Sequence, residues 1–164
     1  MKKLDIAAIP RETGSNYPSP FDEPVKAQVC QRLGPAGGLV QFGVNLTRLP
    51  PGAWSSQRHW HSREDEMVFV VEGEVVLVTD AGEEVLGAGD AAAFKAGDPD
   101  GHHLINRSAR DAVVLEIGSR DPGDACFYPD IDMVAEPGVA HYAHRDGTPY
   151  PPRAGGTWLT GQET

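Results

Sequence analysis

The chain has 164 residues, of which 40% are hydrophobic, and it carries a formal net charge of −10 at pH 7. This length fits a single domain, and the 19 glycines and 14 prolines favour strands joined by many turns over helices. Nucleic-acid backbones and anionic membrane surfaces both require basic patches, so the acidic balance argues against either partner and favours a small molecule.

The first 24 residues contain four prolines and little periodicity, which predicts an extended N-terminal arm. We expect this arm to lie along the rest of the domain or along a neighbouring subunit, with a loose terminus as the alternative. Residues 4–10 are too short and too charged for a signal peptide, and no apolar run approaches the roughly 20 residues that span a bilayer. We therefore expect a cytoplasmic protein, in which Cys30 and Cys126 are reduced thiols because they lie far apart and lack CxxC spacing.

Short strands separated by turn residues are predicted for most of the following chain. Their ranges are 25–32, 39–49, 67–71, 75–78, 91–94, 102–106 and 112–118, with a further extended segment at 54–61. The strands 67–71 and 75–78 are apolar on both faces, so both faces need cover. One face would fill a barrel and the other would meet a second sheet, the arm or a partner subunit, so we expect a homodimer. The spacing of the turns is typical of an all-β sandwich or barrel, and no long helix is indicated.

The last forty residues are rich in proline, glycine, aspartate and tyrosine, which indicates a tail wrapped over the barrel surface. We therefore divide the chain into an extended arm over 1–24, a β-barrel over 25–120 and a C-terminal tail over 121–164.

A candidate metal site begins with His59 and His61. Side chains alternate along a strand, so these two imidazoles point the same way if their segment is extended. The connection that follows is short and polar, so Glu66 would open the next strand of a hairpin and return to the same place. A fourth ligand would come from a distant strand, where a turn at 97–101 can deliver His102. The alternative is a pair of surface histidines beside an ordinary acidic run.

Three imidazoles and one carboxylate suit one divalent transition metal, and zinc, iron, manganese and nickel are not distinguished by this donor set. Four protein ligands leave one or two positions open, and an open position is what catalysis by a metal requires.

The pattern over residues 39–118 resembles the cupin superfamily. The first cupin motif contains a glycine, an HxH pair, a glutamate and a second glycine, and the matching residues are Gly52, His59, His61, Glu66 and Gly73. The second motif is matched by Gly89, Gly97, His102 and Asn106, with Lys95 in place of the usual proline and two extra residues before the histidine. The resemblance implies a double-stranded β-helix, that is, a jelly-roll barrel.

The insertion leaves open whether His102 or His103 is the fourth ligand. The family places three residues between the ligand and its asparagine, and the spacing from His102 to Asn106 keeps that distance. We therefore assign His102, and His103 should face the opposite side of the strand.

The whole chain is similar to small stand-alone bacterial cupins that are labelled as candidate sugar phosphate isomerases. This resemblance implies a metal-dependent enzyme that moves a proton between two carbons of an open-chain sugar, with a general base that the sequence does not identify. It also predicts a cluster of lysines or arginines at the pocket mouth to hold the phosphate. The cations near the motifs are Arg48, Arg58, Arg63, Lys95 and Arg107. Alternative functions are an Fe(II)-dependent dioxygenase and a non-catalytic cupin that binds a small molecule or a metal.

Overall fold

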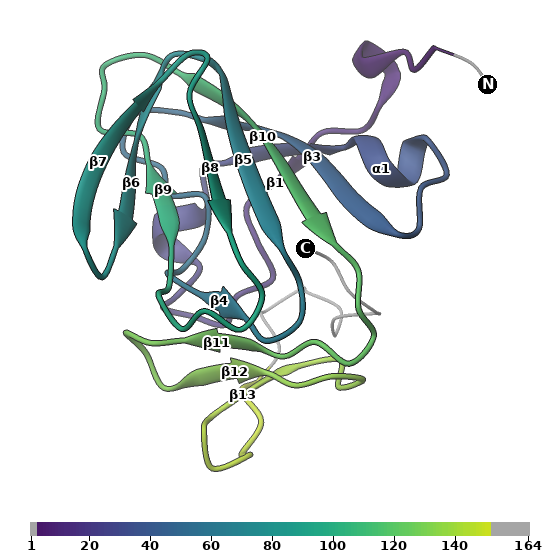
Figure 1. Cartoon of the computed structure of the whole chain (residues 1–164), viewed down its shortest axis with the longest axis vertical. Helices are drawn as coiled ribbons and strands as arrows, with labels where there is room; N and C mark the ends of the chain where they lie inside the picture. The colour runs from purple at the N-terminus through teal and green to yellow at the C-terminus, as the bar shows by residue number, and fades with distance from the viewer. Residues whose placement is uncertain (1–2, 152–164) are drawn as a thin grey trace.

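The computed structural model describes residues 3–151, and it is built almost entirely from antiparallel strands in three sheets (Figure 1). The largest sheet has the order β1-β2-β3-β10-β5-β8, the second β13-β12-β11-β4, and the third β7-β6-β9. The predicted all-β jelly-roll class is therefore confirmed. Within the described residues, no helix is long and apolar enough to cross a bilayer.

The six-stranded sheet brings together strands from both ends of the chain. Its members are β1 (Glu12–Thr13), β2 (Val29–Arg32), β3 (Phe42–Leu49), β5 (Glu66–Glu72), β8 (Ala91–Phe94) and β10 (Ala112–Ser119). The central strand β10 pairs with β3 along its whole length and with β5 on its other side. These pairings set the register of the inner face, which carries the candidate site.

The two smaller sheets complete the barrel. The three-stranded sheet consists of β6 (Glu74–Thr79), β7 (Gly82–Gly87) and β9 (His103–Ile105). The four-stranded sheet consists of β4 (Trp60–His61), β11 (Cys126–Tyr128), β12 (Met133–Ala135) and β13 (Tyr142–Ala143), which lie together at one end of the molecule in Figure 1. Residues after position 120 therefore form part of a sheet with β4.

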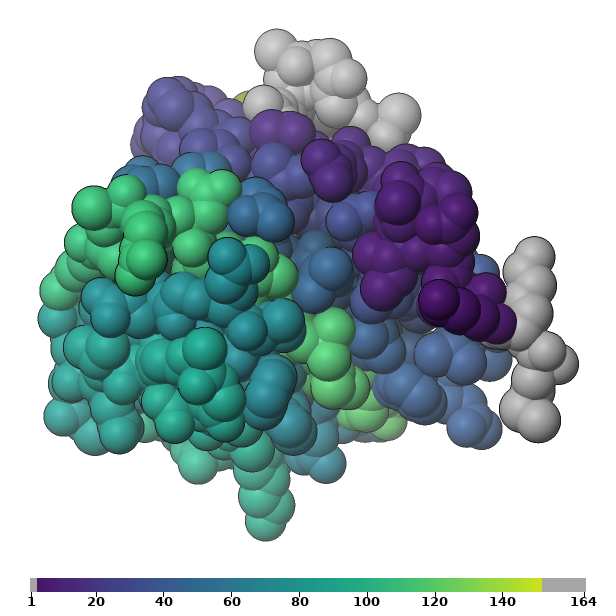
Figure 2. Space-filling view, turned by 90° about the horizontal axis from the view of Figure 1, so that it is seen from above, coloured from purple at the N-terminus to yellow at the C-terminus, as the bar shows by residue number. Residues whose placement is uncertain are grey.

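Helical turns are short. They are η1 (Ile6–Ala8), η2 (Glu23–Val25) and α1 (Leu33–Ala36). Because Pro24 fixes its own φ angle and supports the turn η2, the strand expected over 25–32 begins only at Val29. The arm adds the two-residue strand β1 to the edge of β2, and Figure 2 shows the purple N-terminal residues lying against the blue part of the chain.

Alternating side chains of the central strands fill the core. In β5, Val68 and Val70 are buried while Met67, Phe69 and Val71 point outward. The main core cluster consists of Leu49, Ala53, Val68, Val70, Val75, Leu77, Leu86, Leu104, Ala112 and Val114. Burial of each large aliphatic side chain contributes about 1.5–3 kcal/mol, so this cluster fixes the sheets on which the site is built.

The proposed division of the chain at residues 24 and 120 stays a prediction. Residues 1–2 of the predicted arm and 152–164 of the predicted tail lie outside the described residues.

Candidate metal centre

The backbone brings His59 and His102 together although 43 positions separate them in the numbering. They form an isolated antiparallel bridge, in which the His102 N–H donates to the His59 carbonyl at 2.8 Å and the His59 N–H donates back at 3.1 Å. Opposed residues in an antiparallel pair point their side chains to the same face. The two imidazole rings accordingly lie with centroids 4.8 Å apart.

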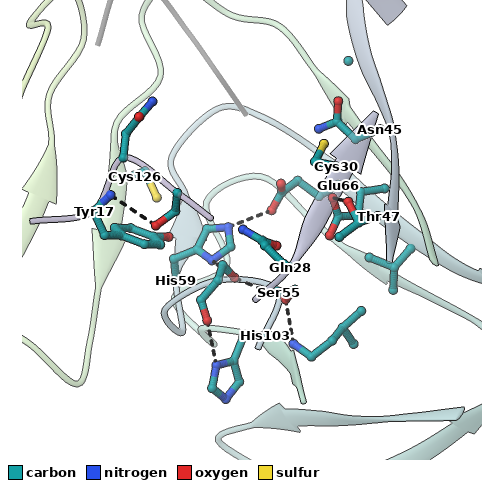
Figure 3. A pocket seen from close by; sticks show the side chains of 18 of the residues that line it. Tyr17, Gln28, Cys30, Asn45, Thr47, Ser55, His59, Glu66, His103 and Cys126 are labelled. Carbon is teal, nitrogen blue, oxygen red and sulfur yellow. Dashed lines mark hydrogen bonds and ion pairs between the residues drawn. The ribbon is translucent and has the colours of Figure 1, made fainter. Parts of the chain in front are cut away.

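One carboxylate oxygen lies where the three predicted imidazoles converge. Oε2 of Glu66 is 3.1 Å from Nε2 of His102 and 3.6 Å from Nε2 of both His59 and His61. Figure 3 shows His59 and Glu66 facing one another across the pocket. The ligand atoms of His59, Glu66 and His102 all lie within 4.8 Å of one another, whereas those of His61 form such a group with His59 and Cys126 and reach this one through the Glu66 oxygen.

The route by which Glu66 reaches this place differs from the predicted hairpin. The strand β4, which holds His61, pairs with β11, whereas β5, which begins at Glu66, pairs with β10 and β8. The chain therefore crosses from one sheet to another between these two residues. The side chains meet because two sheets converge, and the hairpin expectation was wrong.

The donor set fits a divalent metal. Neighbouring ligand atoms about 2.0–2.1 Å from one ion in tetrahedral or octahedral geometry are separated by about 2.8–3.4 Å, and the distances from Glu66 to the three imidazoles are equal to or slightly longer than this. Nε2 of His61 and Oε2 of Glu66 are buried, and neither has a hydrogen-bond partner within residues 3–151. Leaving buried polar atoms unpaired costs about 1–3 kcal/mol each, and a coordinated cation would remove that cost.

The protonation states of two donors favour coordination. At a third, His61, burial alone would lower the pKa, but contacts with Cys126 and Asp124 outweigh it and raise the pKa to about 12, so a metal there would have to displace a proton. Burial lowers the pKa of His102 to about 4, despite the opposing effect of Glu66, so its imidazole is neutral near pH 7. Burial alone would raise the pKa of Glu66, but His102 and His59 outweigh it, and the pKa lies well below its usual value. A neutral imidazole and an ionised carboxylate are the forms that bind metals.

A hydrogen-bond partner at Nδ1 orients the imidazole ring of both His59 and His61. Nδ1 of His61 lies 2.6 Å from Oδ2 of Asp124, whose Oδ1 accepts hydrogen bonds from the Ser62 hydroxyl at 3.1 Å and the Arg63 N–H at 2.7 Å. Nδ1 of His59 lies 2.9 Å from the Gln57 carbonyl. When the proton is on Nδ1, Nε2 keeps its lone pair for a metal. Sequence reasoning missed Asp124, because nothing local marks an aspartate that lies 63 positions from its histidine.

His103 lies in a different environment from His102. Its Nδ1 is 3.1 Å from the Ser56 carbonyl, and its ring meets Trp54 edge-on with centroids 4.5 Å apart. Figure 3 shows His103 away from Glu66. The ring of His102 stacks on Phe94. The geometry therefore supports His102 as the candidate ligand, as the spacing to Asn106 predicts.

The strand β11 supplies a wall that the sequence did not indicate. Cys126 pairs in register with His61, and the ring of Tyr128 lies 5.9 Å from that of His59. Potential ligand atoms of His59, His61 and Cys126 all lie within 4.8 Å of one another, as do those of His61, Glu64 and Asp124. On the opposite face of β4, Trp60 stacks on Phe127.

A cavity of about 340 Å³ opens beside these donors. Its walls come from the arm, β2, β3, β5, β10 and β11, and they include the acidic residues Glu12, Glu66 and Glu116. Among the lining residues of the described chain, Arg32 is the one lysine or arginine, and its Nε donates to Glu12 at 2.8 Å.

The expected cluster of cations is therefore reduced to a single arginine. The other cations near the motifs do not line this cavity, and three of them are held by carboxylates elsewhere: Arg48 by Asp111, Arg58 by Asp130 and Arg107 by Glu83. The Arg58 side chain is only 13% exposed, and Lys95 lines a separate cavity of about 280 Å³ together with His61, Glu66 and His102.

Comparison with known proteins relates most of the chain to one family. The sequence profile of the cupin domain matches residues 45–118. A solved structure from Silicibacter pomeroyi, described as a sugar phosphate isomerase from a cupin superfamily, is 46% identical, with 90% of this chain and 96% of that chain covered and a TM-score of 0.86.

More distant structures agree in fold. One from Acidithiobacillus ferrooxidans, described as a candidate sugar phosphate isomerase, is 27% identical over 71% of this chain and 74% of its own, with a TM-score of 0.67. A polyketide cyclase from Streptomyces resistomycificus, 19% identical over 74% and 80% of the two chains, has a TM-score of 0.59 and shows the fold alone. No match was found among curated proteins.

Proposed function

Since the chain belongs to the cupin superfamily, we propose that it is a metal-dependent enzyme of the sugar phosphate isomerase type. Its metal would be one divalent transition ion held by His59, His61, Glu66 and His102. The observation that carries the proposal is the convergence of three Nε2 atoms within 3.6 Å of one Glu66 oxygen, on the wall of a cavity large enough for a small sugar. The relative from Silicibacter pomeroyi, at 46% identity, supports this substrate class.

A bound metal would supply a Lewis acid that polarises a substrate carbonyl. The residues of the chain would position the sugar around it. Arg32 and Asn45 line the part of the cavity formed by β2 and β3, and the planar guanidinium of Arg32 has the geometry that suits a phosphate. Tyr17 and Tyr128 line the cavity near His59 and would exclude water from the reacting carbons.

The metal is tested first by its content. The protein should be purified without metal-affinity resin and analysed by elemental mass spectrometry, beside the His59→Ala and His102→Ala variants. We expect near-stoichiometric metal in the wild type and at least a tenfold loss in both variants, because each removes one donor. His144→Ala is the matched control, since its imidazole pairs with Asp132 on the surface. A metal-free wild type, or metal retained in both ligand variants, refutes the assignment.

The reaction is tested with the metal-loaded wild type on a panel of aldose and ketose phosphates. Interconversion of one aldose–ketose pair supports the isomerase, and its absence throughout the panel refutes it. Oxygen uptake that depends on Fe(II) would instead identify a dioxygenase.

We also propose that a second copy of the chain covers the outer face of the six-stranded sheet. The rows Val44–Ile117–Met67 and Leu46–Leu115–Phe69 run across β3, β10 and β5 with their side chains on that face. Met67 and Phe69 are 39% and 37% exposed, and Val71 beside them is 49% exposed. These rows contain no charged residue, so a second copy can pack against them without bringing like charges together, despite the net charge of −10.

A further inference from the structure

The central strand β10 carries a carboxyl group toward the same cavity as the candidate metal ligands. Glu116 is opposite Val68 on β5 and opposite Asn45 on β3. Two positions farther along β10, Gly118 is opposite Glu66. Side chains two positions apart share a face, so Glu116 and Glu66 are diagonal neighbours on the inner face, with a Cα separation of about 7–8 Å.

This position lies between the two ends of the cavity. Asn45 is paired in turn with Arg32 on β2, so Arg32, Asn45 and Glu116 form one row across three adjacent strands. All three residues line the cavity. Strands lie about 4.8 Å apart, so a sugar that reached from Glu66 toward Arg32 would place its first carbons beside Glu116.

The contacts of Glu116 leave its carboxyl group able to exchange a proton. The Thr47 hydroxyl donates to its Oε2 at 2.7 Å, and no ion pair to Glu116 is formed within residues 3–151. Figure 3 shows Thr47 on the same side of the cavity as Glu66. A partly buried carboxyl group that had only a structural role would be expected to have a cationic partner or several hydrogen bonds.

Other titratable groups on the cavity wall are less suited to accept a proton at neutral pH. Burial raises the pKa of the Tyr17 and Tyr128 phenols well above 10 and that of the Cys30 thiol to about 11, so all three remain protonated. Glu12 is held by Arg32. Burial, with a contribution from the Glu66 charge, raises the pKa of Glu116 to about 7, which is the range in which a carboxyl group both takes and returns a proton.

We infer that Glu116 is a catalytic residue that transfers the proton between adjacent carbons of the substrate, an inference that rests on the proposed isomerase function. The ionised carboxylate takes the proton from the carbon next to the carbonyl, and the electron pair of the broken C–H bond forms the double bond of an enediolate. The carboxylic acid then returns a proton to the former carbonyl carbon and becomes a carboxylate again, while the proton of the neighbouring hydroxyl group passes to the former carbonyl oxygen, so that the second carbon becomes the new carbonyl. No electrons are gained or lost, and no further reactant is needed.

Two variants separate catalysis from a structural role. Glu116→Gln keeps the volume of the side chain and an oxygen that can accept the Thr47 hydrogen bond, but it cannot take a proton. Thr47→Val removes the hydrogen bond and keeps the carboxyl group. Both should retain the metal content and the melting temperature of the wild type to within a few degrees, which shows that the site is still assembled.

The experiment measures isomerisation, and exchange of substrate C–H for solvent deuterium by NMR, with the aldose–ketose pair found active for the wild type. We expect Glu116→Gln to lower both rates by roughly 10²–10⁴-fold and Thr47→Val by less than about tenfold. Near-wild-type exchange in Glu116→Gln overturns the role of Glu116 and leaves the isomerase standing. A wild type that exchanges no proton with any member of the panel overturns the proposed function, and the role of Glu116 with it.

A measurement on the protein without substrate gives an independent readout. Infrared difference spectra of the zinc-loaded wild type between about pH 5 and pH 9 should show the C=O band of a buried carboxylic acid that disappears as the pH rises. The band should be absent from Glu116→Gln. A band of equal intensity in the variant, or none in the wild type, contradicts the inference.

Discussion

Replacement of Asp124 by asparagine is expected to weaken metal binding about 10- to 100-fold while leaving the fold intact. Oδ1 of Asp124 accepts hydrogen bonds from Ser62 and Arg63, and an asparagine oxygen can keep both. The amide nitrogen of the variant would then face Nδ1 of His61 in place of the carboxylate oxygen that lies 2.6 Å away. Since an amide N–H donates, Nδ1 would have to accept, and the imidazole proton would move to Nε2, where it blocks the lone pair needed by the metal.

The magnitude follows from the lost hydrogen bond. A hydrogen bond to a charged group contributes about 1.5–3 kcal/mol, and each 1.4 kcal/mol changes a dissociation constant tenfold. The assay is competition for Zn²⁺ between the metal-free protein and a chromophoric chelator, at constant pH. Asp132→Asn is the matched control, because it breaks a similar contact, 2.9 Å to Nδ1 of His144, at an exposed place. Equal zinc affinity in Asp124→Asn and the wild type would refute the orienting role of this carboxylate.

Two further predictions concern the fold and its assembly. Gly73 adopts φ +78°, and a Cβ there would lie 2.7 Å from the Asp111 carbonyl oxygen. Gly73→Ala should therefore lower the free energy of unfolding, measured by urea titration, by at least about 1–3 kcal/mol. An unchanged midpoint would contradict this prediction. In analytical ultracentrifugation the wild type should sediment as a dimer and Phe69→Lys as a monomer. The control Val85→Lys changes a residue that is 61% exposed on the three-stranded sheet, and it should remain dimeric. A monomeric wild type would refute the proposed pairing.

Local patterns in the sequence were sufficient to predict much of the fold. Apolar runs on both faces over 67–71 and 75–78 predicted β5 and β6. Such patterns depend on the period of two along a strand and on the φ angles of turn residues, which neighbouring residues determine. One failure had a local cause, since Pro24 supports the turn η2 and the next strand begins only at Val29. The failure of the hairpin expected between His61 and Glu66 had a non-local cause, because β4 and β5 pair in different sheets.

The sequence by itself also brought forward the four candidate ligands. The HxH spacing places His59 and His61 on one face of an extended segment, and the cupin motifs added Glu66 and His102. The sequence did not predict how the chain runs from His61 to Glu66, because β4 and β5 belong to different sheets and meet only when those sheets converge.

Only the tertiary structure showed which residues contact the candidate metal ligands or line the cavity next to them. Asp124 and Cys126 reach His61 through the pairing of β11 with β4, and Glu116 reaches the cavity through the pairing of β10 with β3 and β5. These pairings join segments about 50 to 70 positions apart, and their register is set by burial of the whole core. The alternation of side chains along a strand predicts which residues share a face of that strand. Their neighbours on other strands are determined only when the sheets assemble.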